Sequence, residues 1–198
     1  QKAIFGFGFS STNITNLVSS SGVVATDTTG VGTSRHGLAA AGYGGDKAIF
    51  GYGAGVTNLT NLVSNAGVVA TDTTGVGTAR IVLAAASYGG DKAIFGYGDS
   101  GGDTYVSMSN LVSSSGVVAD DVTGVGTGRS GLAATGYGGD KAIFGYGYNS
   151  SARVSMSNLV SNSGVVATDV SGVGTARDSS AATGYGGDKG IFGYGDTG

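Results

Sequence analysis

One string, YGGDKAIFGYG, occurs three times without change, at Tyr43–Gly53, Tyr88–Gly98 and Tyr137–Gly147. Shorter versions, KAIFGFG and KGIFGYG, stand near the two ends of the 198-residue chain. The lysines of the motif are spaced by 45, 45, 49 and 48 residues; they are Lys2, Lys47, Lys92, Lys141 and Lys189. A steady period of this length indicates that one structural unit is copied along the chain. We therefore interpret 1–198 as a single repeat domain, with units at about 2–46, 47–91, 92–140 and 141–188 and a partial unit at 189–198.

Composition narrows the class of protein. The chain holds 41 glycines but no proline or cysteine, and its net charge is −3. Its glycines do not fall at every third position, which excludes a collagen helix. Hydrophobic residues make up 40% of the chain, which is enough for a packed core. An acidic chain without a basic patch predicts no nucleic-acid partner, and no apolar run approaches the 18 residues of a membrane span.

Each repeat reads as four short strands joined by glycine-rich turns. In the unit 47–91, the expected strands are Ala48–Gly53, Asn58–Ser64, Gly67–Asp72 and Leu83–Tyr88. The intervening GGDK and SNAG segments have the residues that tight turns require. Alternation in AIFGYG predicts that Ala48, Phe50 and Tyr52 share one strand face. No helical period persists for ten residues, so the sequence predicts an all-β protein.

A lone four-stranded sheet cannot bury both of its faces, whereas sheets stacked around an axis can. A period of 45–49 residues fits one blade of a β-propeller, and the alanine-rich strand suits the crowded axis. The sequence therefore predicts a β-propeller of four-stranded antiparallel blades, four of them from this chain. A β-solenoid with two coils per repeat also fits the period.

The ends of the chain leave three arrangements open. If the alanine-rich strand is the first strand of a blade and AIFGYG the second, the chain begins at the second strand of one blade and ends after the second strand of another. The C-terminal SSAATGY strand can complete the N-terminal blade and close a ring. Alternatively, the chain belongs to a longer array, or its unmatched end strands pair with the next chain and build a fibre.

Two sets of residues resemble known repeats. An Arg, a small-residue strand, a glycine turn and KAIFGYG together resemble the kelch repeat, although the usual Trp is absent and GYG replaces the double glycine. The strings NLVSNxGVVATDTTGVGTAR and LAAAxYGGDKAIFGYG resemble repeats of virion structural and tail-fibre proteins of marine bacteriophages, over essentially the whole chain. The resemblance implies a structural or host-contact role in a virion or outside cells, and it transfers no catalytic residue.

Differences between the repeats gather in two places. One is the loop after FGYG, which reads FSSTNI, AGVTNL, DSGGDTYVSM or YNSSARVSM, and the other is the residue pair after each Arg. In a four-stranded meander the connections alternate between the two ends of the sheet. The two variable places therefore share one end, and the GGDK and SNAG turns, which hardly vary, share the other. Loops on a rigid scaffold are where binding is diversified, although drift of exposed loops also explains variation. The candidate recognition residues are Phe9, Ser10, Asn13, His36, Val56, Ile81, Asp99, Asp103, Tyr105, Ser130, Tyr148, Asn149, Arg153 and Asp178.

Residues that commonly carry catalysis or bind metals are scarce. His36 is the only histidine, and without cysteine it cannot complete a zinc site. The Arg and Asp that recur in each repeat are interpreted as turn caps and ion pairs between blades, with a central ring holding an ion or water as the alternative. Asn13, Asn58 and Asn149 lie in glycan acceptor sequences, which matter only in a glycosylating secretory pathway. We expect no cofactor and no enzymatic activity. A propeller with hydrolase or oxidase activity is the least favoured hypothesis.

The sequence thus favours a non-enzymatic recognition module of the phage or extracellular adhesin type. Tyr105 and Tyr148 would provide aromatic platforms beside acceptors such as Asp103, a combination suited to sugars. The expected partner is a cell-surface glycan or protein. The alternative is a purely architectural subunit that self-associates into a larger particle or fibre through its edge strands.

Overall fold

The structure, a computed structural model, describes residues 2–198 and contains thirteen short strands in this part of the chain. The all-β prediction is confirmed, since no helix occurs among these residues, and therefore none that could span a membrane. The strands are β1 (Ala3–Gly8), β2 (Thr12–Val18), β3 (Ala39–Tyr43), β4 (Lys47–Gly51), β5 (Thr60–Val63), β6 (Ala84–Tyr88), β7 (Lys92–Gly96), β8 (Ser109–Val112), β9 (Ala133–Tyr137), β10 (Lys141–Gly145), β11 (Ser157–Val160), β12 (Ala181–Tyr185) and β13 (Lys189–Gly193).

The strands form five small antiparallel sheets. Three complete sheets have the orders β3-β4-β5, β6-β7-β8 and β9-β10-β11, and two-stranded sheets, β1-β2 and β12-β13, stand at the chain ends. The repeats share one register: Phe50 pairs with Ala40 and Asn61, and Phe95 pairs with Ala85 and Asn110. The copied sequence therefore specifies a copied sheet.

The expected outer strand of each sheet, Gly67–Asp72 in the unit 47–91, is not a regular strand in any of these sheets. The segment after β5 makes only isolated bridges, Val63 to Val69 and Thr60 to Thr73. The two pairings differ by one residue in register, which is the mark of a β-bulge. The Asn61 amide fills the bulge, donating to the backbone oxygen of Ala70 at 3.0 Å and to Asp72 Oδ1 at 2.9 Å. This side-chain bonding replaces part of the strand ladder.

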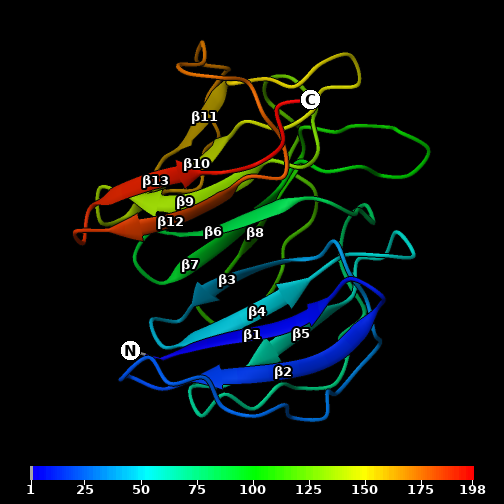
Figure 1. Cartoon of the computed structure of the whole chain (residues 1–198), viewed down its shortest axis with the longest axis vertical. Helices are drawn as coiled ribbons and strands as arrows, with labels where there is room; N and C mark the ends of the chain where they lie inside the picture. The colour runs from blue at the N-terminus through cyan, green and yellow to red at the C-terminus, as the bar shows by residue number, and fades with distance from the viewer. Residues whose placement is uncertain (1) are drawn as a thin grey trace.

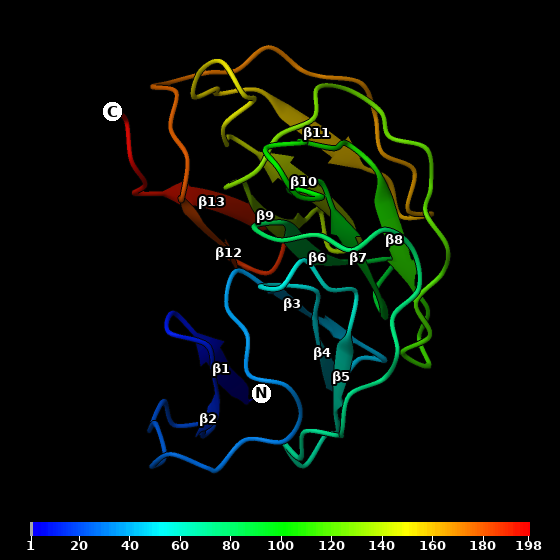
Figure 2. The same ribbon diagram turned by 90° about the vertical axis from the view of Figure 1, so that its right-hand side faces the viewer.

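The sheets follow one another along an open arc (Figure 2), and Figure 1 shows them stacked along the long axis of the molecule. The alanine-rich strands β3, β6, β9 and β12 lie on the inner side of the arc, where each contacts the next. The arc is not closed: β12 pairs with β13, β1 pairs with β2, and within residues 2–198 the two end sheets share no ladder. The C-terminal strand therefore does not complete the N-terminal sheet in this structure.

Hydrophobic cores lie between successive sheets. Ile49 and Tyr52 pack against Phe95 of the next sheet, and the rings of Tyr52 and Phe95 meet edge to face at 5.1 Å. Phe50 instead packs against Phe7 of the preceding sheet. The prediction that Tyr52 shares a face with Phe50 is therefore wrong. Tyr52 has a positive φ of 68°, which turns its side chain toward the following sheet.

Glycines in the second strand allow the sheets to approach closely. A methyl group at Gly51 would lie 2.7 Å from Cζ of Phe95, and one at Gly96 would lie 2.6 Å from Cζ of Phe144. Each phenylalanine therefore occupies space that a side chain on the preceding sheet would otherwise fill. Burial of one such ring contributes about 1.5–3 kcal/mol.

The repeating arginines complete these interfaces. Arg35, Arg80 and Arg129 are fully buried, and the guanidinium of Arg129 lies 4.4 Å from the ring centre of Tyr97 in the preceding sheet. Within its own sheet, Arg129 donates to Asn158 Oδ1 at 2.6 Å. The prediction that the recurring Arg and Asp form ion pairs between blades is therefore wrong. The carboxylate partner belongs to the same sheet as the arginine, and stacking on an aromatic ring links the two sheets.

Candidate recognition surface

The near-constant turns lie together at one end of the sheets. Asn65, in the turn after β5, donates to Asp46 in the turn before β4 at 3.1 Å, and Asn162 donates to Asp140 in the same way at 3.0 Å. We call this end the constant rim. The prediction that these turns share one end is confirmed.

The variable segments meet at the opposite end, which we call the variable rim. They are the loops after FGYG and the residue pairs after each repeating Arg. Backbone hydrogen bonds connect the pairs from one sheet to the next. Val82 N–H donates to the Gly37 oxygen at 2.7 Å, Gly131 to Val82 at 3.0 Å, and Ser179 to Gly131 at 2.7 Å. The variable residues therefore form one continuous strip along the arc rather than isolated loops.

The first residue of each pair is among the candidates predicted from the sequence, but the second residue, which holds the strip together, is not. Gly37, Val82, Gly131 and Ser179 all have φ between 50° and 62°. Glycine adopts this conformation readily, whereas it is unusual for valine and serine. The signal available in the sequence was a glycine at two of the four equivalent positions.

At the N-terminal end of the strip, Phe9 and His36 form an aromatic pair with ring centres 5.6 Å apart. Phe9 is 88% exposed, and Ser11 Oγ lies 3.1 Å from His36 Nδ1. Ser10 is exposed beside them with a positive φ of 68°. These residues present an open apolar ring next to a polar nitrogen.

In the middle of the strip, Tyr105 and Tyr148 come from successive loops, and their rings meet edge to face with centres 5.9 Å apart. The Tyr105 hydroxyl donates to Asp103 Oδ1 at 3.4 Å, and Asp103 is exposed. Limited desolvation and the neighbouring Asp103 raise the pKa of Tyr105. Backbone bridges join Asp99 to Tyr105 and Ile81, and join Tyr148 to Ser130.

The C-terminal part of the strip carries charge. Arg153 Nη2 lies 2.7 Å from Asp196 Oδ2, and its Nε lies 3.5 Å from Asp178 Oδ1. The backbones of Asp178 and Asp196 also form a bridge. Three loops from two sheets therefore meet at one partly exposed ion-pair cluster.

Three candidate residues serve the loops more than the surface. Asn13 is half-buried, and its amide donates to the Gly32 oxygen at 2.8 Å. Asn149 Oδ1 accepts bonds from the backbone of Ser151 and Ala152. Val56 is half-buried next to the following loop, where a methyl group at Gly101 would lie 3.8 Å from Val56 Cγ2.

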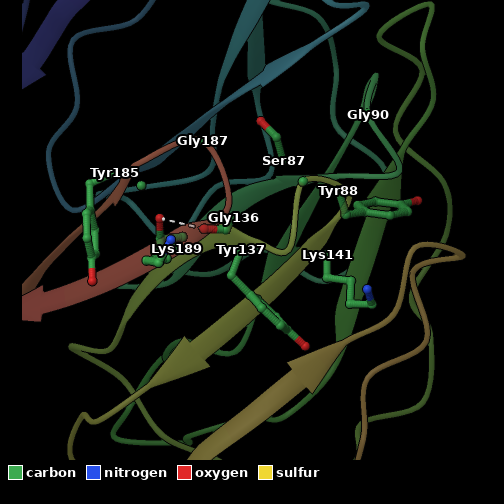
Figure 3. A pocket seen from close by; sticks show the side chains of 12 residues that line it. Ser87, Tyr88, Gly90, Gly136, Tyr137, Lys141, Tyr185, Gly187 and Lys189 are labelled. Carbon is green, nitrogen blue, oxygen red and sulfur yellow. Dashed lines mark hydrogen bonds between the residues drawn. The ribbon is translucent and has the colours of Figure 1, made fainter.

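A hollow of about 510 Å³ lies at the constant rim, among strands β6, β9 and β12 and their turns (Figure 3). Tyr137, Lys141 and Lys189 line it together with several glycines. Each lysine lies close to the preceding aspartate, at 3.3 Å for Lys141 and 2.7 Å for Lys189. Within residues 2–198, no three His, Cys, Asp or Glu side chains come together in a way that could hold a metal ion.

The comparisons with known proteins add no family assignment. No protein-family model matches the chain, and no curated protein is significantly similar to it.

Proposed function

We propose that the chain is a non-enzymatic recognition module, a section of a β-propeller-like array whose variable rim contacts glycans on a cell surface. The observation that carries the proposal is the division of the molecule into two parts. Constant residues pack the sheets together, and variable residues form one strip on a single rim. A diversified strip on a rigid scaffold is the usual arrangement of a binding surface.

The side chains on the strip favour a sugar ligand. Tyr105 and Tyr148 offer ring faces and hydroxyl groups, and the carboxylate of Asp103 accepts hydrogen bonds beside them. Phe9 provides a second exposed ring. Aromatic rings combine apolar area with few rotatable bonds, which lowers the entropic cost of binding.

A virion or extracellular setting is part of this proposal, since surface glycans are met there and the repeats resemble those of phage structural proteins. The open arc is compatible with a propeller whose remaining sheets come from elsewhere. If the partner is a surface protein in place of a glycan, the folded chain will not bind the glycan panel.

The test is binding of the purified chain to a panel of immobilised cell-surface glycans. The informative variant is the double change Tyr105→Ser and Tyr148→Ser, and the matched control is Lys141→Ala on the constant rim. We expect the wild type and the control to bind equally and the double variant to bind at least about tenfold more weakly, equivalent to 1.4 kcal/mol. Absence of glycan binding by the folded wild type would contradict the proposal.

A further inference from the structure

The two end sheets expose opposite halves of an interface that the molecule builds internally. In one internal copy, Tyr43, Ile49 and Tyr52 of one sheet pack against Ala93, Phe95 and Val112 of the next, with Val118 beside them. The next copy repeats the arrangement with the equivalent residues, which are Tyr88, Ile94, Tyr97, Ala142, Phe144, Val160 and Val166. The interface is therefore heterologous: each sheet has a tyrosine-isoleucine face and a phenylalanine-valine face.

The C-terminal sheet leaves its tyrosine-isoleucine face uncovered. Tyr185, Ile191 and Tyr194 are 54%, 53% and 93% exposed, whereas their counterparts Tyr43 and Ile49 are 3% and 0% exposed. We call these three residues the C-terminal end face. The apolar area is present there, but within residues 2–198 the sheet that would bury it is missing.

The N-terminal sheet leaves the complementary face uncovered. Phe5 is 63% exposed and Val24 is 54% exposed, whereas Phe95 and Phe144, the counterparts of Phe5, are fully buried. We call Ala3, Phe5, Val18 and Val24 the N-terminal end face. It presents the ring that each internal tyrosine-isoleucine face accepts.

Two glycines show that the end faces also match in shape. In the internal copies, the phenylalanine ring approaches Gly51 and Gly96, but at the equivalent Gly193 nothing in the described chain lies within 4 Å of an added methyl group. In the same way, a methyl group added at Gly116 would lie 2.9 Å from the Tyr43 ring. One added at the equivalent Gly22 would have nothing in the described chain within 4 Å. Phe5 of one copy would fill the space at Gly193 of another, and Tyr185 would fill the space at Gly22.

We propose that the C-terminal end face of one copy of this chain binds the N-terminal end face of a second copy, stacking sheet β12-β13 on sheet β1-β2. The contact repeats the geometry of the internal interfaces and requires no strand to leave its sheet. This distinguishes it from strand exchange, in which β12 would pair with β1 and β13 would be displaced. Because the interface is heterologous, it leads to rings or filaments rather than to a two-fold dimer. The inference does not depend on glycan binding.

Sedimentation velocity of the purified chain over a wide concentration range tests the proposal. We expect the wild type to associate with increasing concentration beyond the 19.1 kDa monomer. Phe5→Glu and Ile191→Glu each damage one end face, so each variant alone is expected to remain monomeric. The matched control is Val68→Glu, because Val68 is 65% exposed on the constant rim of an internal sheet and lies outside both end faces. The control is expected to associate like the wild type.

Mixing the two variants gives the sharpest result. Phe5→Glu keeps an intact C-terminal end face and Ile191→Glu keeps an intact N-terminal one, so the mixture is expected to form a one-to-one complex and nothing larger. Gly193→Ala provides a second test that leaves the fold intact, and it is expected to weaken association at least tenfold. A wild type that stays monomeric overturns the proposal. Association that survives Ile191→Glu also overturns it, because strand exchange would survive this change.

Discussion

Arg129 and Arg153 are the same residue type in two opposite settings. Arg129 is fully buried between two sheets, stacked on Tyr97 and bonded to Asn158. Arg153 lies on the variable rim, where it is partly exposed and paired with Asp178 and Asp196. The first position recurs in every repeat because a neighbouring sheet must fit it, and the second occurs once because it lies on a loop of the variable rim, where the repeats differ. The comparison separates residues that assemble the scaffold from residues free to change.

The largest expected effect on stability comes from replacing the two arginines. Arg129→Ala takes away the donor to Asn158 Oδ1 and leaves a cavity beside the Tyr97 ring, and we expect a loss of about 3–5 kcal/mol of unfolding free energy. Arg153→Ala removes only partly exposed ion pairs and should cost less than about 1 kcal/mol. Urea unfolding followed by circular dichroism measures both. Equal losses would contradict the assigned roles.

A second comparison concerns equivalent glycines at an internal and an end position. Gly96→Ala places a methyl group 2.6 Å from Phe144 Cζ, and overpacking of this kind costs about 1–3 kcal/mol. Gly193→Ala meets nothing within 4 Å in the described chain, so its unfolding free energy should stay within about 0.5 kcal/mol of the wild-type value. Urea unfolding at a low protein concentration, where the chain is monomeric, provides the measurement. Similar destabilisation of both variants would disprove the close approach.

The hydrogen bonds to Asp72 make the stability of the fold depend on pH. Burial alone would raise the pKa of Asp72, but hydrogen bonds from Thr33 and Asn61 and the charge of Arg35 outweigh burial and lower it below 3.8. A carboxyl whose pKa is lower when folded stabilises the fold above about pH 4. That contribution is lost as pH falls through the folded pKa. The variant Asp72→Asn should therefore lose less stability between pH 7 and pH 2 than the wild type.

Thermal unfolding over this pH range checks the prediction. Thr33→Val removes the hydroxyl that donates to Asp72 at 2.7 Å and should weaken the pH dependence in part. Thr71→Val, next to Asp72 but outside this network, is the control. An Asp72→Asn curve parallel to that of the wild type would remove Asp72 from the acid response.

The smallest expected effect lies in the variable strip. Val82 has a φ of 55°, which costs a branched residue about 1–2 kcal/mol, whereas Gly37 and Gly131 occupy the same conformation without this cost. Because glycine also gains entropy when the chain unfolds, Val82→Gly should raise the unfolding free energy by only about 1 kcal/mol. Denaturant midpoints of the two proteins give the comparison. A decrease would show that the Val82 side chain contributes packing that outweighs the strain.

The sequence predicted features that depend on repetition and alternation. The all-β class and the position of β7 within YGGDKAIFGYG follow from the copied motif and are confirmed. The grouping of the constant turns at one end followed from counting connections. These features depend on local dihedral preferences and on a pattern of period two.

Other features depend on three-dimensional detail that the motif does not express. The expected outer strand at Gly67–Asp72 is interrupted because the Asn61 side chain bonds within a bulge. Strand propensity cannot show such a bond. Tyr52 turns to the other side because of one positive φ at a residue other than glycine. The sequence predicted that the variable segments share one end of the sheets, but it did not predict that their backbones are bonded to one another. Its backbone connections through Gly37 and Val82 arise only when neighbouring sheets are stacked.

The division between scaffold and recognition residues is tested by a chain in which the other three variable loops are replaced by AGVTNL, the sequence already present at 54–59. Its melting temperature and its binding to the glycan panel would be measured beside those of the wild type. We expect the melting temperature to stay within a few degrees of the wild-type value and glycan binding to be lost, because the loops recognise a ligand and the constant residues hold the fold. Retained binding, or unfolding of the variant at moderate temperature, would contradict that division.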